Sequence, residues 1–388
     1  MKDWWYSFSR LPSRFAWSSS AVTRRAPHIR GSSNVQRLWN FFVIASLPAW
    51  LIGLWALGHQ TNLAIADFRL EEVAGWRGGL LAWSGIGFDA SSISACMLHG
   101  LLYFLPVFAV ALAVGAFWET TFATMRKKPV DEGLLAIAWL FSLMMPASVP
   151  LYQVALGMTF GIVVGKLIYG GSGRYLVSPA LLGLAFLVFS YPTLLFGEGA
   201  WVPVPGYDQP SVLELVTDEG GLDVVAAVDY TFWQIFIGDK PGAVGVVSTL
   251  GVLMGAVFLL LTGVASWRIL AGSVIGFITI ALISNNVAPG NDLFTIPWYW
   301  HLVLGGFAFG AVFVATDPVA GPMTNPGRWG FGLLVGSLTM IIRLVNPSYY
   351  EGVMFAILLA CMFSPLIDFV VIEANIRRRR LRLQEGGG

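Results

Sequence analysis

The sequence predicts an all-α polytopic membrane protein with about ten transmembrane helices, arranged as two inverted five-helix repeats. Of its 388 residues, 56% are hydrophobic and only 12% are charged, whereas roughly a quarter of the residues of a soluble domain are charged. The 44 glycines and 16 tryptophans favour close helix packing in lipid and aromatic anchoring at the interfaces. The low charge content and the net charge of +1 exclude a soluble enzyme, a disordered chain and a nucleic-acid binder.

A transmembrane helix needs about 20 mostly apolar residues, and runs of this kind divide the chain. Residues 1–39 form an amphipathic N-terminal segment, 40–197 the first five-helix half, 198–242 a long external loop, 243–373 the second five-helix half, and 374–388 a basic tail. The predicted spans lie at 40–58, 97–118, 133–149, 151–169, 178–197, 243–266, 269–288, 298–316, 331–346 and 352–373.

The distribution of Lys and Arg fixes the orientation, because cytoplasmic loops carry an excess of these residues. Bases gather in segment 1–39, in the loop at 126–128 and in the tail, which carries Arg377, Arg378, Arg379, Arg380 and Arg382. All of these fall on one side if the chain crosses the membrane ten times. We therefore expect both termini to be cytoplasmic, with segment 1–39 on the inner leaflet and the tail bound to anionic membrane lipids.

The long loop on the opposite side is acidic. Between residues 198 and 240 it has eight carboxylates and one base, Lys240. The favoured interpretation is that the loop obeys the positive-inside rule, and the sharper one is that so long a loop hosts a site. Because the loop separates five spans from five, the second half enters from the opposite side, as an inverted repeat requires. Gly/Pro-rich breaks at 170–179 and 316–328 occupy similar places in the two halves.

Three carboxylates lie in or at the ends of predicted spans, namely Glu119, Asp317 and Asp368. An ionisable group there costs at least a few kcal/mol unless it meets water, a partner or an ion. One interpretation is structural, with Asp317 or Asp368 paired to amides of a neighbouring helix or to a base such as Lys166 or Arg343, and with Glu119 at the cytoplasmic interface. The other is a cation uptake path, since oxygen ligands suit hard cations. The position of all three carboxylates toward the cytoplasmic side favours the cation path.

Other chemistry is sparse in the sequence. Cys96 and Cys361 cannot supply an iron–sulfur or zinc site by themselves, and no nucleotide-binding fingerprint is present. The aromatic string at 297–301 indicates an interfacial belt, with His301 as a proton carrier the second interpretation. The sequence therefore identifies no catalytic residue, and we predict no metal beyond a transported cation and expect any nicotinamide chemistry to come from partner proteins.

Several of these segments carry a family resemblance. The sequence resembles the Nqr/Rnf membrane-subunit family, which includes the B-type membrane subunit of the Na+-translocating NADH:quinone oxidoreductase and, more distantly, the D-type subunit of the Rnf complex. The resemblance runs from about residue 24 to the end. The matching strings are Phe117-Trp118-Glu119 and residues 155–161, 170–174, 237–238, 241–242, 247–250, 265–268, 301–310, 315–319, 343–347 and 364–368.

The resemblance implies a fold of ten spans in two inverted halves, in a bacterial inner membrane. It implies covalent FMN in the external loop, riboflavin in the membrane, ubiquinone as substrate and Na+ as the transported ion. It also implies partners, namely other membrane subunits and subunits that oxidise NADH. By position, Glu119, Asp317 and Asp368 match acidic residues linked to Na+ uptake, and Gly115 matches a glycine associated with quinone binding.

The flavin regions depart from the family pattern. Ser211 stands where the family has its FMN-bearing threonine, but Pro205 replaces the motif's Asp and Pro210 also interrupts it. We therefore predict that Ser211 carries little or no covalent FMN. In the riboflavin region, the family's Gly-Arg-Asn and Asn-Pro-Ala become Gly173-Arg174-Tyr175 and Ser178-Pro179-Ala180, so that both amides are lost.

Two functional hypotheses follow. The first is a membrane subunit of an Nqr/Rnf-type complex that couples electron transfer from NADH to quinone, through partner subunits, to the translocation of Na+ or another cation. In that case the chain belongs to an enzyme only as one subunit of it. The alternative is a flavin-free paralogue that acts as an ion or small-solute channel or coupling subunit on the same fold. The long matching strings favour the first hypothesis and the flavin loop favours the second.

Overall fold

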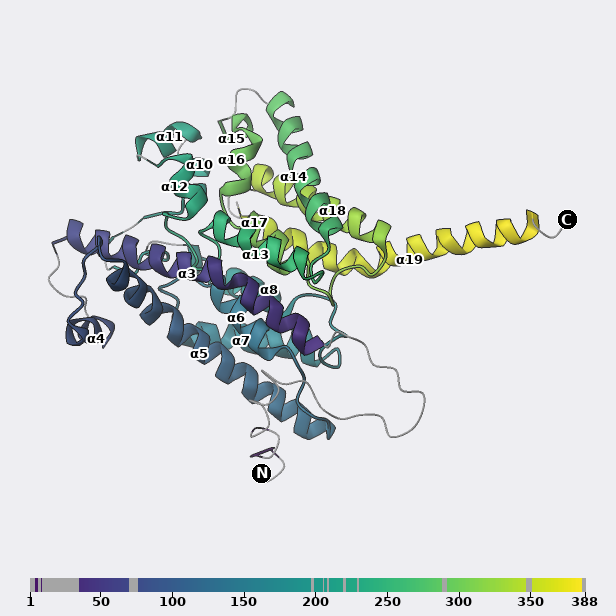
Figure 1. The fold of residues 1–388 in the computed structure, drawn as a ribbon, viewed down its shortest axis with the longest axis horizontal. Helices are drawn as coiled ribbons and strands as arrows, with labels where there is room; N and C mark the ends of the chain where they lie inside the picture. The colour runs from purple at the N-terminus through teal and green to yellow at the C-terminus, as the bar shows by residue number, and fades with distance from the viewer. Residues whose placement is uncertain are drawn as a thin grey trace. The chain divides into compact units, whose positions relative to one another are not determined.

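The computed structural model describes residues 4, 5, 8, 35–69, 76–196, 199–204, 206–207, 209–218, 221–228, 230–287, 292–346 and 351–385 (Figure 1). Within these ranges every regular element is a helix, which confirms the all-α class. The chain forms two compact units. Unit 1 comprises 1–175, 179–212 and 230–264, and unit 2 comprises 176–178, 213–229 and 265–388.

Unit 1 is built around two long helices that cross at small residues. Pro48 lies inside α3 and Pro106 inside α5, and Ser92 caps the start of α5 by accepting a hydrogen bond from the backbone N–H of Ala95 at 3.4 Å. The elements of this unit are α3 (Val35–Asp67), α4 (Trp76–Ser84), α5 (Ile93–Arg126), α6 (Leu134–Leu143), α7 (Leu151–Ile162), the π-helix η1 (Val163–Leu167), α8 (Pro179–Ser190), α9 (Pro192–Phe196), α12 (Phe232–Ile237) and α13 (Thr249–Leu261).

Unit 2 is built around the closely packed pair α14 and α18. A Cβ atom on Gly336 of α18 would lie 1.9 Å from the carbonyl oxygen of Ser273 in α14, so only glycine permits this approach. The elements of this unit are α10 (Val212–Asp218), α11 (Leu222–Ala227), α14 (Trp267–Val287), α15 (Asp292–Thr295), α16 (Trp298–Val303), α17 (Phe307–Phe309), the π-helix η2 (Gly310–Val314), α18 (Asn325–Val345) and α19 (Val353–Glu385).

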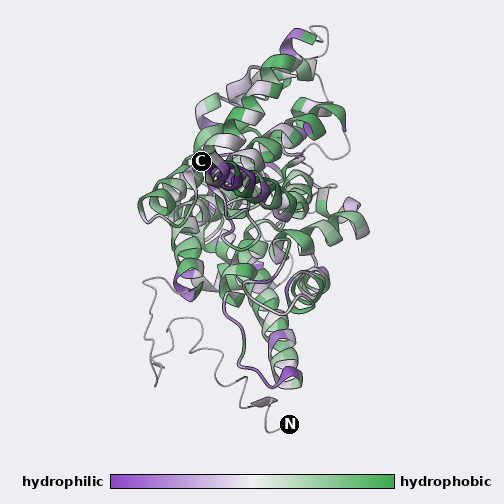
Figure 2. Cartoon of the chain, turned by 90° about the vertical axis from the view of Figure 1, so that its right-hand side faces the viewer, coloured by the Kyte–Doolittle hydropathy of each residue, from purple (hydrophilic) through white to green (hydrophobic). Residues whose placement is uncertain are grey.

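The helices have the length and composition of membrane segments. Five of them, α3, α5, α14, α18 and α19, are long and apolar enough to cross a bilayer. Four shorter apolar segments, α6, α7 with η1, α8 and α13, have 10 to 17 residues, which at 1.5 Å per residue gives about 15–25 Å against a hydrocarbon core of about 30 Å. Figure 2 shows hydrophobic colouring along most helices and hydrophilic residues toward helix ends and connections. The chain is an all-helical polytopic membrane protein.

Three details differ from the predicted spans. The span at 298–316 is not one helix, because the chain breaks after Val303 and resumes at Phe307. Helix α19 continues past residue 373 to Glu385, so that the basic tail extends the last span (Figure 1). Helix α13 packs against α3 within unit 1. The compact units describe packing, and the division into two inverted halves stays a prediction.

Candidate ion site and apolar groove

A fully buried ion pair joins α5 and η1 in unit 1. The ammonium of Lys166 donates a hydrogen bond to Oε1 of Glu119, and both side chains have no exposed surface. Lys166 also donates to the backbone carbonyl of Glu132, at 2.9 Å. Sequence analysis singled out both charged residues but did not pair them with each other.

The π-helical turn gives Lys166 its position. In η1 the backbone N–H of Ile168 bonds to the carbonyl of Val163, five residues earlier, at 3.0 Å. A π-turn inserts one residue into the helical repeat and turns the following side chains to a new direction, which is why such turns gather at functional sites. Here it directs a lysine toward α5 instead of toward lipid. The apolar pattern of residues 151–169 gave no signal of this turn.

Two loops, the one after α5 and the one after η1, surround the ion pair at the end of α5 that carries Arg126. The hydroxyl of Ser172 donates to the same Glu132 carbonyl that Lys166 uses, and its backbone N–H donates to Oδ2 of Asp131 at 3.2 Å. Gly171 has φ +104°, and a Cβ there would lie 1.7 Å from that carboxylate. Asp131 and Glu132 are half-buried. Sequence analysis missed both, because they follow the basic string 126–128; the adjacent acidic pair was the available signal.

The second carboxylate oxygen of Glu119 remains unpaired. Oε2 is buried and has no hydrogen-bond partner in the described part of the chain. A buried polar atom without a partner costs roughly 1–3 kcal/mol. The ion pair therefore satisfies only half of this carboxylate, and the position beside it favours an additional polar or cationic group.

Asp317 lies in unit 2, just after η2, and is 4% exposed. Its Oδ1 accepts hydrogen bonds from the backbone N–H groups of Val319 at 2.8 Å and Ala320 at 3.4 Å. The side chain thereby closes a turn in the Gly/Pro-rich segment before α18. In this structure the Asp317 carboxylate is a loop-forming group.

Asp368 pairs with backbone amides, as one of the two structural alternatives has it, and not with the bases Lys166 or Arg343. Its carboxylate accepts hydrogen bonds from the backbone N–H groups of Met323 at 2.7 Å and Thr324 at 3.0 Å, and from the Thr324 hydroxyl. Thr324 in turn caps α18. Asp368 therefore anchors the loop at the N-terminal end of α18, where the helix dipole favours a negative charge.

Arg343, the buried base of unit 2, holds the break between α16 and α17. Its guanidinium donates to the carbonyls of His301 at 2.7 Å and Leu304 at 3.2 Å, while the backbone N–H of Gly306 donates to Glu351 at 2.7 Å. A cation thus caps the end of one helix and a carboxylate the start of the next.

His301 corrects part of the aromatic-belt interpretation. Trp298 and Tyr299 are well exposed, as a belt requires, but His301 is fully buried.

Comparison with known proteins identifies the family. The sequence profile described as "NQR2, RnfD, RnfE family" matches residues 22–377. The chain belongs to that family. It is 42% identical over 381 residues to the B-type subunit of the Na(+)-translocating NADH-quinone reductase of Azotobacter vinelandii, covering 97% of this chain and 94% of that protein. It is 43% identical to the corresponding B-type subunits of Pseudomonas paraeruginosa (97% and 94%) and Chromohalobacter salexigens (94% and 89%).

The resemblance to the NQR2/RnfD/RnfE family predicts a quinone-associated role for Gly115, and that role stays a prediction. Gly115 is buried in α5, where an added Cβ would lie 2.5 Å from Cδ1 of Leu134 and 2.9 Å from Cε of Met158. Its absent side chain leaves room for the ends of the Leu134 side chain from α6 and the Met158 side chain from α7. The glycine face of the helix is therefore tightly packed in this structure.

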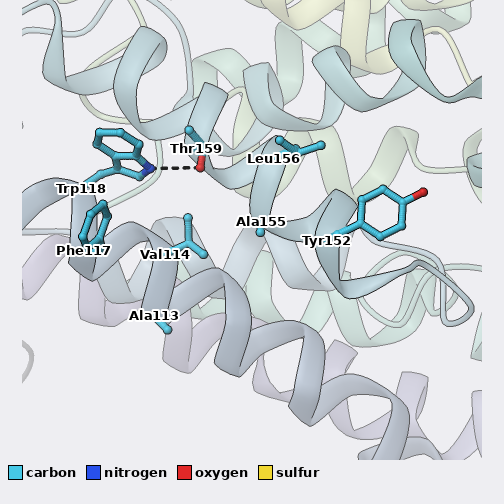
Figure 3. A pocket seen from close by; sticks show the side chains of 8 residues that line it. All are labelled: Ala113, Val114, Phe117, Trp118, Tyr152, Ala155, Leu156 and Thr159. Carbon is cyan, nitrogen blue, oxygen red and sulfur yellow. Dashed lines mark hydrogen bonds between the residues drawn. The ribbon is translucent and has the colours of Figure 1, made fainter.

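An open groove lies between α5 and α7, close to the buried pair (Figure 3). It encloses about 580 Å³, and its wall is almost entirely apolar. The lining residues are Ala113, Val114, Phe117, Trp118, Tyr152, Ala155, Leu156 and Thr159. The indole N–H of Trp118 donates to the Thr159 hydroxyl at 3.0 Å and fixes one end of the groove. Such a surface suits a hydrocarbon or isoprenoid chain.

The expected flavin residues of this family member are only partly suited to a flavin. Tyr175 in unit 1 is 3% exposed, Ser178 in unit 2 is 7% exposed, and Arg174 is exposed. The two buried side chains occupy packing positions. A riboflavin contact at these residues stays a prediction, and no chemical step is assigned to it.

Ser211 is half-buried and directly precedes α10. Pro205, which replaces the Asp of the FMN motif, lies outside the described residues, whereas Pro210, which also interrupts the motif, is half-buried. Nearby in the loop, Gln209 donates a hydrogen bond to the Tyr230 hydroxyl at 2.9 Å. Burial, with smaller contributions from Asp239 and Tyr207, raises the pKa of Tyr230 to about 12, so its phenol stays protonated at neutral pH.

Proposed function

We propose that this chain is the B-type membrane component of a redox-driven Na+ pump. The single observation that supports it most strongly is the 42% identity to the B-type subunit of a Na(+)-translocating NADH-quinone reductase over 97% of the chain. The buried carboxylate of Glu119 supplies a polar site for an ion, and the neighbouring groove supplies an apolar surface. A membrane component of this kind needs both. The chain acts as one subunit of an NADH:quinone oxidoreductase.

The other subunits of the complex supply the NADH chemistry, since the sequence has no nucleotide-binding fingerprint. Quinone, ubiquinone in the first instance, is the electron acceptor. We assign its isoprenoid chain to the groove between α5 and α7, because the groove is apolar and open toward lipid. Gly115 lies on the same turns of α5 as the groove residues Val114 and Phe117, but it faces Leu134 and Met158.

Glu119 is the first residue we assign to the ion path. It is the buried carboxylate that has an unpaired oxygen, and oxygen ligands suit hard cations. Asp317 and Asp368 are assigned to the path by the family resemblance. Within unit 2 they hold the loop between η2 and α18, and they contribute less to ion affinity because backbone N–H groups bond to Oδ1 of Asp317 and to both carboxylate oxygens of Asp368. The path opens to the cytoplasm of a bacterial inner membrane, both termini are cytoplasmic, and the arginines of α19 meet anionic lipid.

A transport assay tests this proposal. The complete complex, with this chain and with Glu119→Gln, is reconstituted in liposomes, and NADH-driven ²²Na+ uptake and NADH:ubiquinone turnover are measured at varied Na+. We expect Glu119→Gln to raise the Na+ concentration for half-maximal turnover and to slow uptake. The control is Glu373→Gln, an exposed carboxylate of α19. Normal Na+ dependence of Glu119→Gln contradicts the proposed ion path.

The presence or absence of covalent flavin distinguishes the proposed function from the alternative, a flavin-free channel or coupling subunit. FMN and riboflavin are cofactors in this proposal only at the level of the complex, and the altered context of Ser211 predicts little or no covalent FMN on this chain. In-gel fluorescence of the denatured chain, co-expressed with a flavin transferase, measures it. A strong band that disappears in Ser211→Ala contradicts this prediction and restores the covalent site. A flavin-free chain that conducts Na+ without electron transfer favours the channel alternative.

A further inference from the structure

We propose that Lys166 is a tethered substitute for the transported cation. Its ammonium occupies the oxygen-lined position beside Glu119 that a Na+ ion takes during transport, and the two exchange. This inference rests on the proposed role of Glu119 in the ion path.

The position of the Lys166 nitrogen has oxygen ligands suited to a small cation. Nζ is held by Oε1 of Glu119 and by the carbonyl of Glu132, and the hydroxyl of Ser172 donates a hydrogen bond to that carbonyl. A carboxylate and a backbone carbonyl are oxygen ligands that hard cations take in proteins. The ammonium is bound by these two oxygens. Withdrawal of Nζ therefore leaves a set of oxygen ligands already in place.

The unpaired oxygen of Glu119 gives the site room for exchange. Because Oε2 has no hydrogen-bond partner in the described residues, Glu119 can contact an incoming ion through Oε2 while Oε1 still holds the ammonium. Glu119 then has a cation beside it at every stage, first Lys166, then both cations and finally the ion, and in the middle stage the loop carboxylates of Asp131 and Glu132 balance the second positive charge. This avoids the cost of an uncompensated charge at membrane depth.

The surroundings of Lys166 provide a place for the displaced ammonium. Its flexible four-carbon stem carries a compact charge, and the neighbouring loops hold the half-buried Asp131 and Glu132. Lys166 already bonds to the backbone of that loop. We infer that the ammonium swings toward these loop carboxylates when Na+ binds Glu119, so that charge is exchanged and never created in the interior.

The decisive variant is Lys166→Gln in the complete complex. Without the competing ammonium, Na+ binds Glu119 more tightly, and the half-saturating Na+ concentration for turnover should fall by about fivefold or more, within the usual range of coupling between sites. The variant complex should also gain thermal stability from Na+ over choline by more than the unaltered complex does, since a ligand that binds only the folded state stabilises it. The control is Lys128→Gln, an exposed lysine beyond the end of α5.

A purely structural ion pair gives different results. Lys166→Gln would then be unstable equally in Na+ and in choline, or would show an unchanged Na+ requirement, and either outcome overturns the proposal. Lys166→Arg is the second variant. A guanidinium binds a carboxylate with a planar fork, so this variant should raise the Na+ requirement, and a fall would contradict the proposal. If Glu119→Gln shifts the Na+ requirement and Lys166→Gln does not, only the tethered-cation inference fails. If neither shifts it, the proposed ion path fails as well.

Discussion

The described residues contain two π-helical segments, η1 and η2, which differ in how the buried charges around them are compensated. Both η1 and η2 follow a short helix and lead into a Gly/Pro-rich loop that ends at a helix beginning with proline at its first or second residue. At η1 the buried charges meet each other, as Glu119 with Lys166. Beyond η2 the carboxylates of Asp317 and Asp368 meet backbone N–H groups, and the base Arg343 meets carbonyls.

This difference separates exchangeable from fixed charges. A carboxylate bonded to backbone N–H groups is bound to groups that cannot leave without unfolding a turn. A carboxylate bonded to the end of a lysine side chain is bound to a group that can move by bond rotation. The region around η1 is therefore suited to cation exchange, and the region around η2 to holding a loop and a helix break. Three predictions test this comparison, and a fourth concerns a group outside both regions.

The largest effect is expected when the exchangeable pair is broken. Glu119→Gln leaves the Lys166 ammonium buried without its counter-charge, and we expect a loss of about 3–5 kcal/mol of stability. The double variant Glu119→Gln/Lys166→Met removes both charges and should recover most of that loss. Thermal unfolding of the purified complex measures both. A double variant no more stable than Glu119→Gln would contradict the buried pairing.

The next effect concerns the fixed base. Arg343→Lys keeps the charge but carries all its N–H groups on one nitrogen, whereas two separate nitrogens of Arg343 reach the His301 and Leu304 carbonyls, so we expect a loss of about 1.5–3 kcal/mol, the value of a charged hydrogen bond. Thermal unfolding is measured beside Arg378→Lys, an exposed arginine of α19. Because Arg343 lies outside the proposed exchange, the Na+ requirement of surviving complex should be unchanged. An altered requirement would remove the distinction between the two regions.

A smaller effect is expected for the fixed carboxylate. Asp368→Asn keeps one acceptor oxygen for the loop at Met323 and Thr324, and we expect it to lose about 1 kcal/mol, the typical value of one hydrogen bond. Its change in Na+ requirement should be smaller than that of Glu119→Gln. Turnover is titrated with Na+ for both variants, with Glu373→Gln of the same helix as control. A larger shift for Asp368→Asn would reverse the comparison.

The smallest effect is expected at Tyr230, in the loop that is predicted to be external and lies outside both regions. Because burial raises the pKa of Tyr230 to about 12 from its ordinary 10.0, the protonated phenol stabilises the folded loop fully below pH 10, and this contribution is lost as the pH rises through 12. Stability measured between pH 9 and pH 12 should therefore fall more steeply in the unaltered protein than in Tyr230→Phe. Equal slopes would show that Tyr230 titrates as an exposed phenol.

Sequence reasoning predicted the helical class and most of the helices because apolar composition and length are local properties. It located Glu119, Lys166, Asp317, Arg343 and Asp368 because a charge in an apolar string is visible in one dimension. It did not predict the partners of these charges. Asp368 illustrates the reason: Met323 and Thr324 are about 45 residues away, and only the packing of α18 on α19 brings their N–H groups to it.

Composition and hydrophobic pattern by themselves thus determined that this chain is a polytopic helical membrane protein with a few buried charges. Tertiary structure alone decided which charges pair, where helices break and which carboxylate keeps an unpaired oxygen. The physical reason is that hydropathy is a sum over residues that are neighbours in the sequence. An ion pair or a helix cap instead requires two atoms that can be far apart in the sequence to lie close together in space. The π-turn at Lys166 and the helix break at Leu304 change side-chain direction by less than one turn, and no run of apolar residues records that change.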